Sequence, residues 1–389
     1  MKKKKYTLRK FINDIHLWLG IGSGIILVII CLTGTVLTFE EEIKSLFAEE
    51  VIVSPTTEIL PIEKLKETLA SEGEVMRVTI NLEKTKPYEF SVKTNEEDRR
   101  GTSFFIDQYK GNYVKKAENP LDGLFMTNFK LHRWLLLDLK IGRPIVGIAT
   151  IIFLIISITG IVLWFPNKKL KKLKWKSLKP GFKIDWRGKW KRINHDLHVT
   201  LGFYTAVFLV IMSLTGLFWS FEWYRDAGSA VLGTEVFGGR GGGPKIDSKI
   251  PQNEDTLSFA EILKITESEL VFEGTTVFQI PKDESEIFSV RKYHDQDFLQ
   301  TASDELKIDR DGSIISKELF SEKPLNVQIA SSIKAIHTGT IFGWFSKTIY
   351  FISCLIATSL PITGTIIWLN KLNKKNRKSK KMQKVKVKE

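Results

Sequence analysis

The chain has 389 residues, a formal net charge of +14, and 43% hydrophobic residues. A basic chain of this kind would suit nucleic acid if the charge covered a soluble surface, but here it gathers beside long apolar segments, which excludes that class of partner. Only Cys31 and Cys354 could form thiolates, and both fall inside apolar segments. The polar segments therefore form neither disulfides nor thiolate metal sites.

Four windows of the chain are long, apolar and nearly free of charge. Each has about 20 residues, the length that an α-helix needs to cross a hydrocarbon core of roughly 30 Å. They are Leu17–Phe39, Ile145–Phe165, Leu201–Phe221 and Ile349–Leu369. The sequence therefore predicts a helical membrane protein with four transmembrane helices. The first window is too long for the core of a signal peptide, and we expect it to remain as an anchor.

Basic residues crowd three regions that flank the predicted helices. These are the N-terminus, the segment Lys168–Arg192 and the tail Lys371–Lys388. Because an even number of crossings places all three on one side, the positive-inside rule predicts that both termini are cytoplasmic. The same residues are expected to contact anionic lipids.

These signals predict nine consecutive regions. The expected order is a cytoplasmic N-terminus (1–16), the first transmembrane helix (17–39), the first exported domain (40–143), the second helix (144–166), a basic cytoplasmic loop (167–192), the third helix (193–222), the second exported domain with a glycine-rich linker (223–347), the fourth helix (348–370) and a basic cytoplasmic tail (371–389). We expect a multi-pass protein of the cytoplasmic membrane, with its domains outside.

The chain carries an internal duplication. A shift of 182 positions lays Asp14-Ile15-His16 on Asp196-Leu197-His198 and Leu32-Thr33-Gly34 on Leu214-Thr215-Gly216. A shift of about 205 lays His132 on His337 and Ile158-Thr159-Gly160 on Ile362-Thr363-Gly364. Each half therefore reads as helix, exported domain, helix, in the same direction. Such a parallel repeat predicts a function between the halves.

The two exported segments resemble each other in their predicted elements. Each has one short helix, at Ile62–Ala70 or Phe259–Thr266, followed by strand-like runs. Each closes with Ile-Asp before a turn that contains glycine, at Asp107 and Asp309. We expect two small α+β units of about 60 residues each. The segment Gly238–Pro244 lacks the flanks of a phosphate loop and is predicted to be a flexible connector.

Five of the six histidines lie at predicted membrane edges, and His294 alone lies within an exported domain without an assigned role. The five are His16, His195 and His198 on the cytoplasmic side and His132 and His337 on the outer side. A single histidine at a helix end can be an interfacial side chain. Two equivalent histidines that face a shared axis can instead supply both axial ligands of one haem. Histidine pairs alone would leave most metal ions under-coordinated.

Two further features leave alternatives open. The Thr-Gly pair that recurs in all four helices can allow close helix packing or let a porphyrin lie against the backbone. Trp164 and Trp368 follow two of these glycines and are expected to anchor the helices in the interface.

Three features together carry a family resemblance: the motif His-Leu-Trp-Leu-Gly followed by Leu-Thr-Gly at His16–Gly34, its echo at His198–Gly216, and the paired Ile-Asp turns. With these features the chain resembles the PepSY-associated transmembrane proteins, also called PiuB-type iron-regulated membrane proteins. The resemblance covers about Lys10 to Leu372. It implies four helices, two exported PepSY domains, an inner-membrane location, and b-type haem, with two haems expected. By position it implies His16, His198, His132 and His337 as ligands, with His195 as a spare.

Two functions of different classes follow. The first is a haem-dependent oxidoreductase that reduces an exported ferric siderophore or similar chelate during iron acquisition, with an electron donor that is either cytoplasmic or a quinol. The second is a non-enzymatic membrane anchor whose PepSY modules bind a peptide, a peptidase or an envelope partner. Transport of the chelate is a weaker third hypothesis, because Pro361 is the only break near a helix midpoint.

Overall fold

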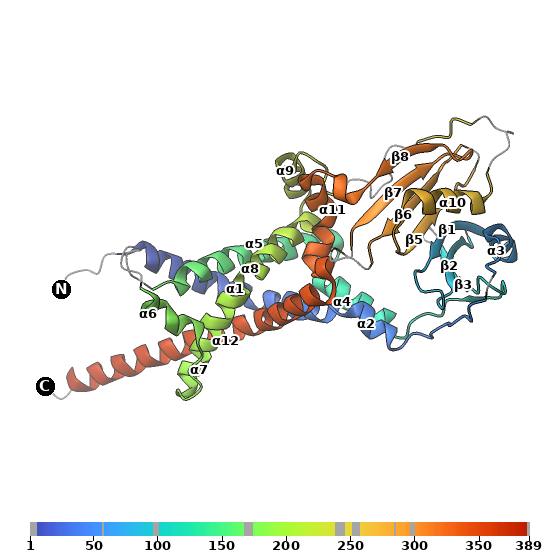
Figure 1. The fold of residues 1–389 in the computed structure, drawn as a ribbon. Coiled ribbons are helices and arrows are strands. Elements are labelled where there is room, and N and C mark those ends of the chain that lie inside the picture. Colours follow the sequence, from blue (N-terminus) through green and yellow to red (C-terminus); the bar gives the residue numbers. More distant parts are fainter. Residues whose placement is uncertain are drawn as a thin grey trace.

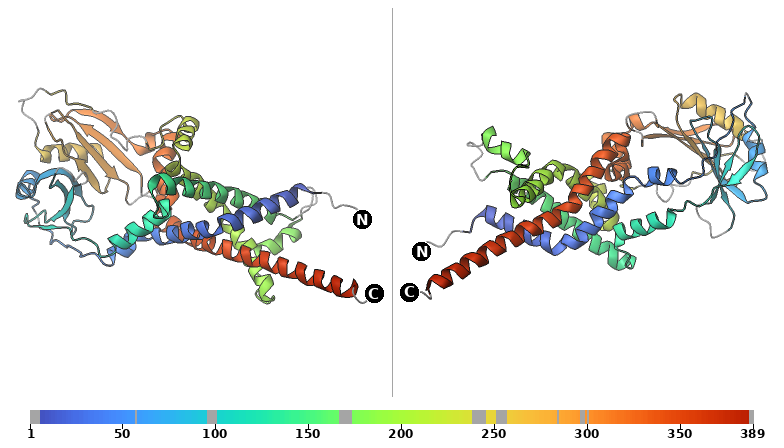
Figure 2. Two further views of the ribbon diagram at one scale, coloured as in Figure 1. Left: turned by 180° about the vertical axis from the view of Figure 1, so that it is seen from behind. Right: turned by 90° about the horizontal axis from the view of Figure 1, so that it is seen from below.

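The computed structural model describes residues 6–56, 58–95, 101–166, 174–237, 246–250, 257–283, 285–295, 299 and 301–386. The molecule is elongated, with a bundle of helices at one end and a β-sheet at the other (Figures 1 and 2). The first turns of α1 and the last turns of α12 lie at the end away from the sheet. The expected connector 238–244, the first five residues and part of the basic loop (167–173) lie outside the described residues.

Four helical segments are long and apolar enough to cross a membrane. They are α1 (Leu8–Leu37), α5 (Leu139–Trp164), the segment Trp190–Ser220, and the Thr340–Lys374 part that includes most of α12 (Gly343–Lys386). Large apolar side chains such as Ile25 and Val207 point away from the protein, 80% and 60% exposed. Lipid can cover such side chains, and helices satisfy their own backbone hydrogen bonds there. The prediction of a multi-pass membrane protein is confirmed.

The regular α-helix of the third crossing segment is interrupted at a histidine that is predicted to ligate haem. It consists of α7 (Trp190–Asp196), the π-turn η3 (Leu197–Leu201) and α8 (Gly202–Ser220). His198 lies within the π-turn. Single π-turns inside helices are frequent at functional sites.

Short helices flank the crossing helices. At the sheet end they are α2 (Glu40–Ser45), α4 (Asp122–Trp134), α9 (Glu222–Leu232), α11 (Leu325–Thr338) and η5 (Thr340–Phe342). At the other end they are α6 (Trp175–Leu178) and η2 (Lys179–Phe182). Left-handed residues end α4 and α11, namely Leu135 (φ 56°) and Gly339 (φ 77°). These caps turn the chain sharply, so that α4 and α11 pack against crossing helices instead of extending α5 and α12.

The two segments that the sequence predicts to be exported join in one antiparallel sheet of eight strands, in the order β4-β3-β2-β1-β5-β6-β7-β8. The strands are β1 (Glu74–Ile80), β2 (Tyr88–Lys93), β3 (Thr102–Ile106), β4 (Tyr113–Lys115), β5 (Thr276–Gln279), β6 (Phe288–Tyr293), β7 (Ser303–Ile308) and β8 (Ile314–Glu318). The junction is the pairing of β1 with β5, where Val78 lies opposite Phe278. The sequence predicts two separate small units; the structure shows that they share a sheet.

The hydrophobic core of the sheet domain lies on one face of the sheet. The helices α3 (Ile62–Thr68) and α10 (Phe259–Glu269) cover this face (Figure 1). Leu65 and Ile262 from the helices pack with Phe90 and Phe278 from the strands, and all four side chains are 0% exposed. Because alternate strand residues point to opposite faces, the other face is left with polar side chains. That face lies toward the membrane helices.

Candidate functional site

The structure brings together the four histidines that the duplication relates. The ring centres of His16 on α1 and His198 on η3 lie 6.3 Å apart, with an angle of 88° between the ring planes. The ring centres of His132 on α4 and His337 on α11 lie 6.5 Å apart, with an angle of 51°. Each pair therefore takes one member from each half of the chain. We call His132 and His337, which lie toward the sheet, the outer pair, and His16 and His198 the inner pair.

Each imidazole is fixed through its Nδ1 atom to a neighbouring helix. His16 Nδ1 lies 3.1 Å from the Ile156 carbonyl and 3.0 Å from Thr159 Oγ1. His132 Nδ1 lies 3.0 Å from the Ile30 carbonyl and 3.1 Å from Thr33 Oγ1. A carbonyl oxygen only accepts hydrogen bonds, so Nδ1 carries the proton and the lone pair is on Nε2.

The other half repeats this arrangement. His337 Nδ1 lies 3.0 Å from the Met212 carbonyl and 3.1 Å from Thr215 Oγ1. His198 Nδ1 lies 3.0 Å from Thr363 Oγ1, and this hydroxyl donates to helix carbonyls, so it accepts from the imidazole. Such partners set the tautomer and orientation of a ligating histidine.

The glycine of each Thr-Gly pair makes room for an imidazole. A Cβ atom added at Gly34, Gly160, Gly216 or Gly364 would lie 3.2, 3.3, 3.0 or 3.1 Å from Cε1 of the histidine seated there. Every one of the four Thr-Gly pairs is thus a seat for one histidine. The sequence offered helix packing or contact with a porphyrin for this motif; in the structure each glycine makes room for the histidine of a neighbouring helix. The sequence contained a signal for these seats, because the number of Thr-Gly pairs equals the number of paired histidines.

Asparagines reinforce one seat in each pair. Asn128 Nδ2 donates to the Thr33 carbonyl at 3.0 Å, and Asn194 Nδ2 donates to the Thr363 carbonyl at 3.1 Å. Each asparagine precedes a paired histidine by one helical turn. Sequence reasoning did not identify either residue, because each has no asparagine at the matching position of the other half.

The remaining two histidines lie elsewhere. His195 is half exposed, and its Nδ1 lies 3.3 Å from Asp196 Oδ1. The structure therefore does not place this expected spare ligand in the inner pair. In the sheet, the His294 ring stacks on Phe272 with centres 4.1 Å apart, and its Nε2 lies 3.3 Å from Asp304 Oδ2.

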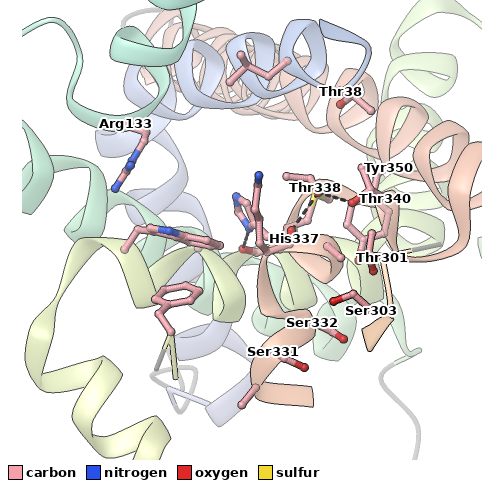
Figure 3. A pocket seen from close by; sticks show the side chains of 18 of the residues that line it. Thr38, Arg133, Thr301, Ser303, Ser331, Ser332, His337, Thr338, Thr340 and Tyr350 are labelled. Atoms are coloured by element: carbon pink, nitrogen blue, oxygen red, sulfur yellow. Dashed lines mark hydrogen bonds between the residues drawn. The ribbon is translucent and has the colours of Figure 1, made fainter. Parts of the chain in front are cut away.

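The outer pair, His132 and His337, lies in the wall of a cavity of about 2180 Å³. Apolar side chains of α1, α5 and α8 line its membrane part, and polar residues of β6 and β7 line the opposite part. Figure 3 shows His337 and Tyr350 beside this space, with Arg133 across from them and Ser303 of the sheet nearby. The outer pair is therefore connected with the polar face of the sheet.

Charged groups border the cavity. Lys44 Nζ lies 2.6 Å from Glu40 Oε1 and 2.9 Å from Asp122 Oδ1. The hydrogen bond from the Lys44 ammonium holds the pKa of the Asp122 carboxyl below its ordinary value. Lys347, whose side chain is 7% exposed, pairs with Glu42 and joins α12 to α2. The rim thus presents both signs of charge.

The inner pair, His16 and His198, has different surroundings. Asp196 lies two residues before His198, is 4% exposed, and accepts hydrogen bonds from Arg192 at 2.7 Å and from the backbone of Asp185 at 3.3 Å. These bonds tie η3 to the basic loop. The expected interfacial anchor Trp164 stacks on Phe203 with ring centres 3.8 Å apart and donates to the Gly181 carbonyl. Trp164 therefore packs beneath this loop, whereas Trp368 lies against Trp18.

Each pair offers only two imidazole nitrogens as metal ligands, which limits the kind of metal group that it could bind. Within the described ranges, no group of three or more histidine, cysteine, aspartate or glutamate side chains could hold a metal ion. Two neutral imidazoles with free Nε2 atoms could ligate a metal whose other positions are filled by a second group, as a porphyrin does for iron.

Comparison with known families identifies the chain. The family model of the PepSY-associated TM region matches residues 14–371. The chain belongs to the PepSY-associated TM family. A search among curated proteins finds no match. All four seated histidines fall within the PepSY-associated TM region, so the paired arrangement lies in the part of the chain that the family model covers.

Proposed function

We propose that this PepSY-associated TM protein is a di-haem b protein of the inner membrane that passes electrons across the membrane to reduce an exported ferric chelate such as a siderophore. The observation that supports the proposal most is the recurrence of one seat four times, which holds two pairs of imidazoles with Nδ1 bonded and Nε2 free.

The spacing of the rings is the one expected if two imidazoles held one metal between them. An imidazole nitrogen lies about 2.0–2.1 Å from a bound transition metal and about 1.1 Å from its own ring centre, so two imidazoles across one metal have centres about 6.3 Å apart. The observed separations are 6.3 and 6.5 Å. If the two imidazoles of each pair only packed against each other, nothing would require the same spacing in both pairs.

A b-type haem at each pair would supply one-electron transfer. The chain's own residues would hold it: the threonine hydroxyls and helix carbonyls orient the imidazoles, and the glycines leave room for them. His132 contacts Gly34, which follows His16 by about 18 residues on α1, so the two pairs lie roughly 27 Å apart along the helix at ~1.5 Å per residue. Two groups at this separation would lie near the opposite faces of a hydrocarbon core of roughly 30 Å.

The cavity beside the outer pair supports an exported substrate. Its volume of about 2180 Å³ exceeds the usual range of small-molecule pockets, roughly 300–1,000 Å³. Reduction of ferric to ferrous iron weakens its binding by hard oxygen ligands, which would release iron from a chelate. The electron donor would act at the opposite end, beside the inner pair, and the sequence points to either a cytoplasmic donor or a quinol.

The proposed topology places the sheet outside and both termini in the cytoplasm. The charges support it, because the lysine- and arginine-containing helices α6 and α7 and the start of α1 lie at the end away from the sheet (Figure 1). The halves would be parallel repeats, each with two crossing helices and half of the sheet.

The test is the visible spectrum of the full chain in mild detergent, before and after dithionite, followed by addition of a ferric hydroxamate chelate. We expect a Soret band that sharpens on reduction, resolved α and β bands, and reoxidation by the chelate. A colourless protein, even when it is produced with added haem precursor, would refute the proposal. It would favour the alternative in which the PepSY modules bind a peptide, peptidase or envelope partner.

A further inference from the structure

Three sulfur atoms from three crossing helices line the membrane part of the cavity. They belong to Cys31 on α1, Met212 on α8 and Cys354 on α12. Cys31 and Cys354 are the only cysteines of the chain, and they come from opposite halves. Cys354 borders the seat of His132, but neither thiol is hydrogen-bonded to a paired histidine, so the proposed function leaves both thiols without a role.

Two of the three sulfurs are in contact, and the third belongs to a buried cluster against which Met212 packs. Cys354 Sγ is 3.6 Å from Met212 Sδ and 3.9 Å from the position that a Cβ of Gly34 would take, one turn beyond Cys31. Cys31 is 7% exposed in that cluster. Sulfur ligands lie about 2.3 Å from a bound metal, so two of them at tetrahedral to trigonal angles are about 3.7–4.0 Å apart. The observed separation of 3.6 Å is near this range.

We propose that Cys31, Cys354 and Met212 form a binding site for a soft monovalent cation, Cu(I). Thiolate and thioether ligands select Cu(I) over harder ions, and a three-sulfur set suits its low coordination number. This inference goes beyond the proposed function and does not depend on it. The competing interpretation is that the three side chains only fill space, since free cysteine and methionine are common in apolar cores.

The reaction at this site is a ligand exchange without redox change. Cu(I) binds as each of the two thiols loses its proton, so two S–H bonds break and two Cu–S bonds form, while the thioether adds without proton loss. The protons and the incoming ion both use the cavity, which extends from these sulfurs to the polar face of the sheet. Soft Ag(I) should occupy the same set.

The experiment is anaerobic Cu(I) titration of the purified full chain, with any bound cofactor left in place, in competition with the chelator bathocuproine disulfonate. We expect about one Cu(I) per chain, loss of this binding in the Cys31→Ser/Cys354→Ser double variant, and weakening by at least about tenfold in Met212→Leu. Met126→Leu is the matched control, because Met126 is half exposed on α4 and lies outside the cavity. Retention of Cu(I) by the double variant would overturn the proposal.

A second measurement does not depend on variants that fold. X-ray absorption of the Cu(I)-loaded wild-type chain should show sulfur neighbours at about 2.3 Å. A shell of nitrogen neighbours would mean that the ion binds a histidine pair, and absence of any retained copper would mean that the sulfurs only pack. Either result contradicts the site.

Discussion

The inner and outer histidine pairs are held in the same way and differ in access. The inner histidines belong to crossing segments, α1 and η3, and are seated on α5 and α12. The outer histidines belong to α4 and α11, which turn back to be seated on α1 and α8. Only the outer pair lines the large cavity that reaches the sheet. The difference teaches that one local seat can recur in two different surroundings, of which only the outer one opens to the cavity.

Removing one pair at a time should give the largest effect. We expect His16→Ala/His198→Ala and His132→Ala/His337→Ala each to lose about half of the bound haem, because each pair would hold one group. Haem would be counted by the pyridine haemochrome method. The outer double variant should also lose chelate reduction while the inner spectrum persists. Equal loss of all haem in both variants would show that the pairs are not independent.

Blocking one seat should be the next largest effect. In Gly34→Val the new side chain would occupy the space of the His132 ring, whose Cε1 is 3.2 Å from an added Cβ. We expect haem affinity at the outer pair to fall about 100-fold, with the inner pair unchanged. Gly22→Val on the same helix is the control, since its Cβ meets no atom within 4 Å. Haem titration of both variants measures the difference, and equal affinities would contradict the seat.

Removing one hydroxyl should have a smaller effect. Thr33→Val deletes the oxygen that lies 3.1 Å from His132 Nδ1 but leaves the Ile30 carbonyl in place. We expect about a tenfold loss of haem affinity and a shifted midpoint potential for the outer pair alone. Thr35→Val is matched to it, because the Thr35 hydroxyl donates only to its own helix, at the Cys31 carbonyl. If redox titration gives the same potentials for both variants, the threonine does not tune the site.

The smallest expected effect comes from a residue that distinguishes the pairs. Trp219 lies beside His337 with ring centres 5.2 Å apart, and the corresponding position of the other half is Leu37. Trp219→Leu should weaken haem binding at the outer pair about two- to fivefold, the lower part of the range that an aromatic contact contributes. Trp223→Leu, at an exposed position on α9, is the comparison. A spectral change at the inner pair would contradict the assignment.

The sequence predicted the crossing helices and the four paired histidines because hydropathy, charge and duplication are signals carried by single residues and their spacing. It did not predict the seats, since the partners of His16 and His132 are about 140 and 100 residues away and meet only after helix packing. Nor did it indicate how deep α4 lies. The polar residues Asn128, Lys130 and Arg133 make α4 look like a surface helix, yet Asn128 and His132 bond to α1 well inside its apolar part.

The junction of β1 with β5 has a consequence for how the protein is made. β1 ends at Ile80 and β5 begins at Thr276, so about 200 residues separate the partners. At a synthesis rate of roughly 5–20 residues per second, the first half of the sheet waits about 10–40 s with the β1 edge open. During that interval the edge can pair with other chains. Synthesis of the second half provides β5, which pairs with β1 and so ends the interval in which the open edge of β1 can pair with another chain.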